Sequence, residues 1–193
     1  MDENPAAVHR STVSKPPPVA PGVLVGLLST RAAAGRGEQL RHASAAAAWL
    51  IEQGLLPPDA EVTEAERRRL LELREDLYAL LIDPRRRWTG EAARLFNRRI
   101  RDAPLEVSVT SDRTVRIASP DRTFDGALGK IVSLVVHSYF AGQWKRFKEC
   151  AREECLRVFY DDSRGGARRW CDERCGDKVR TRKHRSAVRH GRR

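Results

Sequence analysis

The sequence predicts an α+β protein in which a mostly helical N-terminal domain, with a small β-hairpin, precedes a small cysteine-bearing unit. Three observations predict this class. Leucines recur at helical spacing over long segments of the first half. One segment alternates apolar and polar residues on both sides of a turn. All four cysteines lie in the last quarter of the chain. The predicted divisions are residues 1–22, 23–147 and 148–190.

The first 22 residues predict a disordered leader, because they are polar, small and interrupted by a cluster of prolines. Such a segment buries too little apolar area to offset the entropy lost on ordering. The short apolar run Val23–Leu28 then predicts a buried strand, and residues 31–39 predict a loop.

Two helices with recognisable ends follow. Residues 41–53 are rich in alanine, and Gly54 suits the position that ends a helix. The next helix is predicted to begin at Thr63, which forms a capping box with Glu66. Leucines at helical spacing continue this helix to Ile82.

The rest of the N-terminal domain is predicted to contain two more helices and a hairpin. One helix begins near Thr89 and runs to Ile100. Leu105–Ser119 predicts the hairpin, because apolar and polar residues alternate on both sides of SDRT. Between Phe124 and Phe147 apolar residues fall on more than one face, which predicts a long buried helix leading directly to the first cysteine.

The four cysteines form two close pairs separated by 15 residues, with spacings C-x4-C and C-x3-C. This pattern gathers four thiolates around one tetrahedral Zn²⁺. The predicted ligands are Cys150, Cys155, Cys171 and Cys175.

The residues between the cysteine pairs predict a hairpin, with strands at 156–161 and 167–170 around the turn DSRGG. Cys171 and Cys175 would then share one face of the first turn of a helix. The predicted unit is a treble-clef-like zinc finger that depends on the metal for much of its folding energy.

Two other uses of the cysteines compete with this interpretation. Isolated buried cysteines are common, although four in this pattern are not. A redox pair favours C-x-x-C, which neither pair has. A catalytic zinc keeps one position open for water, whereas four cysteines fill the coordination shell.

Positive charge is concentrated at the C-terminal end. Residues 145–193 hold 17 Lys and Arg against 8 Asp and Glu, whereas the whole chain has a formal net charge of +11. On a helix that begins near the second pair of cysteines, one stripe of cations suits nucleic-acid phosphates: Arg174, Lys178, Arg182, Arg185 and Arg189. The predicted contacts are Arg168, Arg169, Arg174, Lys178, Arg180, Arg182, Lys183, Arg185 and Arg189. A solvated basic tail is the alternative, and the charge pattern leaves DNA and RNA both open.

Other classes of protein receive little support from the sequence. There is no 20-residue apolar run and no signal peptide, so we expect a cytoplasmic protein. No catalytic motif is present. A treble-clef nuclease would need a histidine in or beside the hairpin, and none lies between Cys150 and Lys183. We therefore expect no enzyme.

Residues 147–185 resemble the CGNR zinc finger, named for a Cys-Gly-Asn-Arg motif. The resemblance is carried by the four cysteines, by Phe159-Tyr160-Asp161 with Ser163-Arg164, by Arg169-Trp170, and by Gly176. His184 and Arg185 fit the family's basic helix. The order of elements upstream resembles the ABATE domain, which accompanies this finger in stress-induced transcriptional regulators, mainly bacterial.

The chain departs from the family pattern at two places. Asp177-Lys178 stands where the finger has Asn-Arg, which affects contacts specific to that pair but leaves the four thiols in place. Ser29-Thr30 stands where the first ABATE element ends in Asn-Thr. The resemblance implies a DNA-binding regulator with an N-terminal domain that senses a small molecule or a protein. An RNA-binding or protein-interaction module is the alternative.

Overall fold

Residues 21–32, 36–82 and 90–190 are described in the computed structural model. In these ranges the protein has six α-helices, one 3-10 turn and two antiparallel two-stranded sheets. The predicted α+β class is confirmed. Residues 1–20 of the predicted disordered leader lie outside the described residues, and Gly22 is already helical.

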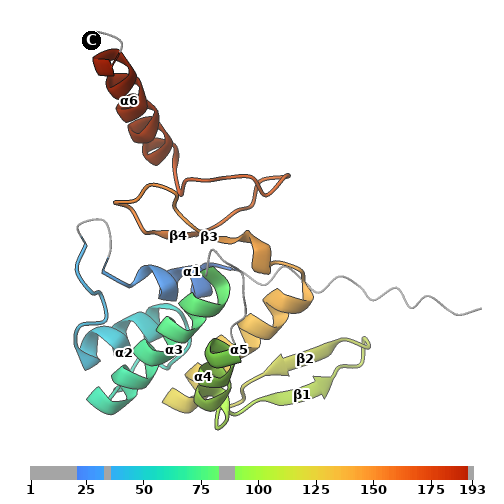
Figure 1. Ribbon diagram of the computed structural model, residues 1–193. Coiled ribbons are helices and arrows are strands. Elements are labelled where there is room, and N and C mark those ends of the chain that lie inside the picture. The colour runs from blue at the N-terminus through green and yellow to red at the C-terminus, as the bar shows by residue number, and fades with distance from the viewer. Residues whose placement is uncertain (1–20, 33–35, 83–89, 191–193) are drawn as a thin grey trace, which may run out of the picture.

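The helical layer is built around α3 (Glu64–Ile82), which packs against α1 (Gly22–Ser29), α2 (Ala43–Glu52) and α4 (Gly90–Ile100). Figure 1 shows α5 (Phe124–Phe140) in the same layer, where it contacts α1 and α4. Their shared core is formed mainly by leucines with almost no exposed surface. Its most buried large members include Leu24, Leu27, Leu50, Leu70, Leu73, Leu77 and Ile131. Within the described residues, no helix has the length and apolar character needed to cross a bilayer.

The prediction of a strand at Val23–Leu28 is wrong, because these residues form α1. Leu24, Leu27 and Leu28 are buried, at the i, i+3, i+4 spacing of one helix face. An apolar run this short fits a buried strand and a buried helix equally well. Packing against α3 and α5 decides between them.

The predicted ends of α2 and α3 are confirmed. Gly54 follows α2 with φ +67°, the left-handed conformation that suits glycine after a helix. At α3 the backbone N–H of Thr63 donates to Glu66 Oε2 at 2.7 Å, and the backbone N–H of Glu66 donates to Thr63 Oγ1 at 3.2 Å. These two bonds are the reciprocal pair of a capping box.

The predicted third helix and hairpin are also present. Helix α4 begins at Gly90, and Thr89 lies outside the described residues. Strands β1 (Glu106–Val109) and β2 (Val115–Ala118) pair antiparallel, with Glu106 opposite Ala118. The hairpin packs on α5 through β2.

The prediction of one helix from Phe124 to Phe147 is wrong at its C-terminal end. Helix α5 stops at Phe140, and Gly142 follows with φ +67°. A 3-10 turn η1 (Trp144–Arg146) and strand β3 (Phe147–Glu149) then lead to the first cysteine. The glycine permits the sharp exit from the helix, and the strand is free to pair elsewhere.

The predicted pairing inside the finger is wrong as well. Strand β3 pairs with β4 (Val158–Tyr160), whereas residues 167–170 form no strand. This pairing places Phe147 and Val158, 3% and 1% exposed, in the same core as the helices. The Ser29 hydroxyl at the end of α1 donates to the carbonyl of Val158 at 3.2 Å. The finger is thus anchored to the helical layer.

A buried ion pair fixes the end of α1 on α3. Arg74, 4% exposed, donates two hydrogen bonds of 2.8 Å to the carboxylate of Glu38 and one of 2.9 Å to Thr30 Oγ1. A buried guanidinium needs partners of this kind to offset its desolvation. The network holds in place the helix against which β4 packs.

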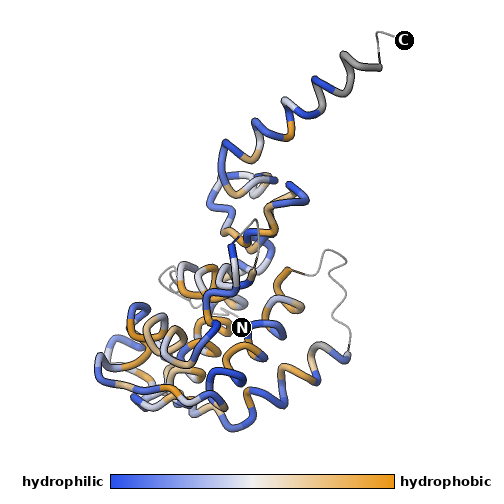
Figure 2. The backbone as a smooth tube through the Cα atoms, turned by 90° about the vertical axis from the view of Figure 1, so that its left-hand side faces the viewer, coloured by the Kyte–Doolittle hydropathy of each residue, from blue (hydrophilic) through white to orange (hydrophobic). Residues whose placement is uncertain are grey.

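Helix α6 (Glu173–His190) extends away from the rest of the protein. In Figure 1 strands β3 and β4 lie between the helical layer and α6. Figure 2, viewed from the side, shows α6 again standing clear of the other elements and largely hydrophilic. The C-terminal helix is therefore presented to solvent by the finger.

Candidate metal centre and nucleic-acid interface

The structure brings the four predicted cysteines together at the base of α6. Their sulfur atoms all lie within 4.8 Å of one another, and Cys150, Cys155 and Cys175 are buried. Three of the Sγ–Sγ distances are 3.7 Å, those that join Cys155, Cys171 and Cys175 in a triangle. All four cysteines are free thiols rather than disulfides.

These distances fit a tetrahedral zinc ion. With Zn–S bonds of about 2.3 Å, the edges of the sulfur tetrahedron are about 3.8 Å long. A disulfide would need sulfur atoms about 2.05 Å apart. Four soft donors this close together suit a metal ion, and zinc is the metal that this donor set favours.

Burial changes the acidity of the thiols. It raises the pKa of Cys171, with the hydrogen bonds to the neighbouring thiols acting in the same direction, and it raises the pKa of Cys175 to about 11. At Cys155 the net effect is a lowered pKa. Burial raises it, but hydrogen bonds from the backbone N–H of Arg157 and from the other thiols lower it by more. A metal ion that binds here must displace protons, so binding weakens in acid.

Arg152 is a charged neighbour of the cluster that sequence reasoning missed. Its side chain is 16% exposed. Burial lowers the pKa of the guanidinium, but the negative charge on Cys175 and Cys155 raises it by more, so the net effect is a raised pKa. A zinc ion with four thiolates carries a net charge of −2, and the Arg152 guanidinium offsets part of it.

Short-range backbone bonds place the thiols. The backbone N–H of Cys150 donates to the carbonyl of Arg157 at 2.9 Å, and that of Cys155 donates to the carbonyl of Arg152 at 2.8 Å. Together they close the C-x4-C turn after β3. Leu156, with φ +50°, then takes the left-handed conformation and redirects the chain into β4.

The second pair of cysteines is placed by a helix start that differs from the prediction. Cys171 lies two residues before α6, so only Cys175 is helical. The side chain of Asp172 accepts a hydrogen bond of 2.8 Å from the backbone N–H of Cys175, which satisfies one of the unpaired donors of the first turn. The two sulfurs still approach to 3.7 Å.

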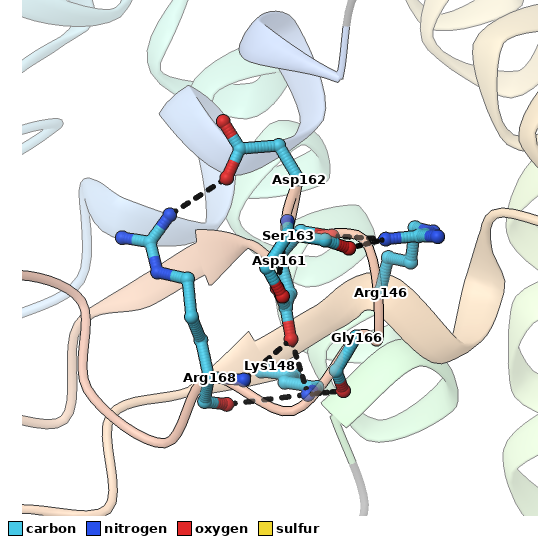
Figure 3. A network of polar contacts seen from close by, with 7 residues as sticks. All are labelled: Arg146, Lys148, Asp161, Asp162, Ser163, Gly166 and Arg168. Atoms are coloured by element: carbon cyan, nitrogen blue, oxygen red, sulfur yellow. Dashed lines mark hydrogen bonds and ion pairs between the residues drawn. The ribbon is translucent and has the colours of Figure 1, made fainter.

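A buried carboxylate organises the loop between the two pairs. Asp161 is 0% exposed and accepts hydrogen bonds from Lys148 Nζ at 2.6 Å, the Arg168 backbone N–H at 2.9 Å and the Ser163 hydroxyl at 2.5 Å. Figure 3 shows these groups converging on it from β3 and from both sides of the turn. Burial opposes ionisation, but these bonds hold the pKa of Asp161 below its usual value of 3.8.

The same Lys148 ammonium also donates to the carbonyls of Gly166 and Arg168, and Arg146 Nη1 donates to the carbonyls of Asp161 and Ser163. The loop therefore takes its shape from two cations beneath it. Neither Arg146 nor Lys148 was singled out from the sequence, because lysine and arginine in a basic segment give no signal of burial.

The predicted nucleic-acid contacts fall in two places. Arg168 and Arg169 are exposed on the loop before α6, which is not the predicted strand. The others lie on α6, and their described side chains are exposed: Arg174, Lys178, Arg180, Arg182 and Arg185. Lys183 and Arg189 are on α6, but their side chains lie outside the described residues.

Three of these cations are already paired with acidic residues of the finger. Arg182 Nη1 lies 2.6 Å from Glu154 Oε1, and Arg168 Nη1 lies 2.8 Å from Asp162 Oδ1. The side chain of Arg180 lies 2.5 Å from Asp177 Oδ1. These exposed pairs are weak, and a phosphate competes with each carboxylate. The sequence predicted these cations but not the carboxylates that pair with them.

The Trp170 ring packs against the first turns of α6, beside Gly176 and Arg180. A Cβ atom on Gly176 would lie 3.3 Å from the Trp170 ring, so the absence of a side chain lets the indole lie close to the helix. Arg169 and Arg180 lie over the same ring, 5.6 and 5.9 Å from its centre. Cation–π contacts of this kind orient both guanidinium groups.

Two family models match the chain. Residues 146–187 match the model described as "CGNR zinc finger", and residues 23–137 match the ABATE model, described as "Putative stress-induced transcription regulator". The second match alone spans more than half of the 193 residues. No curated protein sequence matches the chain.

Proposed function

The chain belongs to the ABATE family and carries a CGNR zinc finger, and on this basis we propose that it is a zinc-dependent, DNA-binding transcriptional regulator of bacterial origin. The observation that carries the proposal is α6. This helix begins at the four-thiol centre, presents exposed cations and extends away from the helical layer (Figure 1).

The proposed zinc ligands are Cys150, Cys155, Cys171 and Cys175. Four thiolates fill the coordination shell of zinc, so the proposed role of the metal is structural rather than catalytic. Both matched families are regulatory or zinc-finger types rather than enzymes. The metal would fix the start of α6 against the C-x4-C turn and thereby aim the basic helix.

The shape of α6 supports DNA over RNA as the partner. The major groove of B-DNA is about 12 Å wide and admits an α-helix. The major groove of A-form RNA is too narrow for one. Arg174, Lys178 and Arg185 are exposed on α6 and make no ion pair with the described residues, so they are available to phosphates.

The proposal assigns separate tasks to the two parts of the chain. Residues 148–190 would form the finger, and residues 23–147 would form the domain that responds to a small molecule or a protein. A regulator of this kind acts in the cytoplasm of a bacterium, where the DNA is.

Neutralising two free cations of α6 tests the proposal. In Lys178→Gln/Arg185→Gln we expect duplex binding to weaken about tenfold per lost phosphate contact at 0.1 M salt. The slope of log K against log salt should become shallower by about 0.9 per contact. Fluorescence anisotropy with a labelled random duplex, repeated over a salt series, measures both quantities.

The matched control is Arg113→Gln/Arg116→Gln, which removes two exposed cations from the distant hairpin and should leave binding unchanged. Equal losses in the control and the α6 variant would mean that net charge alone drives binding. Salt-independent binding, tighter binding to RNA, or a protein complex that survives high salt would favour an RNA-binding or protein-interaction module instead.

Removing the negative charge of Asp177 should strengthen duplex binding, whereas neutralising the cations should weaken it. Its carboxylate pairs with Arg180, so Asp177→Asn should release that guanidinium and remove one negative charge from the helix. We expect duplex binding to strengthen about threefold to tenfold, with a steeper salt slope. Glu173→Gln is the control, because it removes an exposed acid of the same helix that has no ion pair in the described structure. Weaker binding by Asp177→Asn would show that Asp177 orients Arg180 productively.

A further inference from the structure

A cavity of about 800 Å³ lies at the joint between the helical layer and the finger. Its walls come from the end of α3, the end of α5, and the segment from η1 through β3 to the first cysteine. Cavities of this volume bind small organic molecules. The other cavities are smaller, and the exposed valines of the β1–β2 hairpin show nothing that identifies their partner.

The walls of this joint cavity are mostly apolar and aromatic. Tyr78, Tyr139, Trp144 and Phe147 contribute rings, and the last turn of α3 adds aliphatic side chains. Tyr139 meets Trp144 edge to face with ring centres 5.2 Å apart, although Tyr139 is itself 55% exposed. A planar ring would gain contacts with these side chains and would cover part of the exposed tyrosine.

The polar groups of the cavity select the charge of the ligand. Lys148 is already bonded to Asp161, but Lys145 is exposed and makes no ion pair with the described residues. Arg169 adds a second exposed cation at the same cavity. The opposite charge comes from Glu149, one of whose oxygens is buried without a hydrogen-bond partner in the described structure. The buried oxygen of Glu149 is not accessible to a ligand, so the two exposed cations favour an anion.

We propose that the joint cavity binds an aromatic carboxylate, whose ring packs against Tyr139 and Trp144 and whose carboxylate pairs with Lys145. This ligand matches the apolar walls and the positive rim together, whereas the two exposed cations would repel a cationic ligand.

The location of the cavity connects the ligand to the metal centre. Cys150 and Ala151 form part of its wall. The backbone N–H of Ala151 donates to the carbonyl of Arg169 at 2.8 Å, which joins the C-x4-C turn to the loop before α6. A ligand that fills the cavity therefore lies against both segments that carry the thiols. This effector role rests on the function proposed above, whereas ligand binding itself does not.

Calorimetric titration of the zinc-loaded full chain tests the site, with 2-naphthoate as the probe and 2-naphthamide as its uncharged counterpart. We expect the carboxylate to bind at least about tenfold more tightly than the amide. Lys145→Gln should reduce that preference at least about threefold while leaving amide binding unchanged, since Arg169 remains as a second cation. Tyr139→Ala should weaken both probes about tenfold. Phe140→Ala is the matched control, since Phe140 is 74% exposed and does not line the cavity. Its ring meets Tyr139 edge to face, so a loss smaller than that of Tyr139→Ala is expected.

Equal affinity for the two probes, an undiminished preference in Lys145→Gln, or absence of binding at millimolar probe would overturn the proposal. Equal losses in Tyr139→Ala and Phe140→Ala would also overturn it, because they would place the probe outside the cavity. Titrations contain no nucleic acid, so their failure is separate from a failure of duplex binding. Duplex affinity with and without 2-naphthoate then reports whether the site is coupled to α6.

Discussion

Replacing Cys171 by serine should remove the metal and unfold the finger. The wild-type protein should hold about one zinc per chain, and the variant about none after dialysis against a weak chelator. Binding of structural zinc contributes about 10–16 kcal/mol in small fingers at pH 7, so its loss exceeds what the small β3–β4 sheet can replace. Elemental analysis, thiol titration and duplex anisotropy measure the outcome, and duplex binding should be lost with the metal.

Two matched variants sharpen this test. Ala151→Ser adds a hydroxyl beside the cluster at an exposed position and should retain the metal. Cys171→His restores a zinc donor and should retain part of the affinity, since three cysteines and one histidine form a common site. A Cys171→Ser protein that still holds one zinc and binds DNA would mean that the four thiols are not the ligand set.

The parts of the fold that the sequence predicted well are set by local chemistry. The capping box at Thr63 and the left-handed Gly54 involve residues at most three or four positions apart, so their signals are complete within a short window. The β1–β2 hairpin is equally local, because its strands alternate and its turn lies between them.

The wrong predictions concern segments whose secondary structure depends on contacts with residues distant in sequence. Val23–Leu28 is helical because its leucines face α3 and α5, which lie more than 35 residues away in sequence. Strand β3 follows directly on an apolar segment whose pattern predicts one continuous helix. It pairs with β4 because this pairing buries Phe147 and Val158 in the helical core. No short window contains that information.

The same distinction holds at the candidate site. Cysteine spacing predicted which thiols would meet, because two close pairs and one loop suffice to gather them. Spacing did not predict Arg152 beside the sulfurs or Lys148 beneath Asp161, since these cations lie within a segment rich in exposed arginine and lysine. It also placed Arg182 on the phosphate-facing stripe without its partner Glu154.

The shared core has a consequence for how the finger works. Phe147 and Val158 belong to the helical core, and Ser29 bonds to β4 where the family pattern has asparagine. The finger is therefore held by the helical layer on one side and by the proposed metal on the other. A change in the helical layer can reach the base of α6 through β3 and β4, a route that needs no flexible linker.

Asp161→Ala should destabilise the finger by about 3–5 kcal/mol, because it removes the carboxylate and leaves the Lys148 ammonium, 20% exposed, without its countercharge. The backbone N–H of Arg168 and the Ser163 hydroxyl would lose their acceptor as well. Asp162→Ala is the control on the next residue. Its pair with Arg168 is exposed, so its loss should cost no more than about 1 kcal/mol. Urea denaturation of the zinc-loaded proteins, followed by circular dichroism, measures the difference.

The difference in unfolding free energy between Asp161→Ala and Asp162→Ala should depend on pH if the charge on Asp161 causes it. Hydrogen bonds hold the pKa of Asp161 in the folded protein below the usual 3.8. The unfolded chain therefore takes up this proton first as the pH falls, and the stabilisation, complete above about pH 5, is lost progressively below pH 4. The free energy of unfolding of Asp162→Ala should exceed that of Asp161→Ala by a constant amount from pH 7 to 5, and the gap should narrow in more acidic solution. Because acid also releases zinc, metal content is followed at each pH. A gap that stays constant down to pH 3 with zinc retained would mean that Asp161 acts through packing alone.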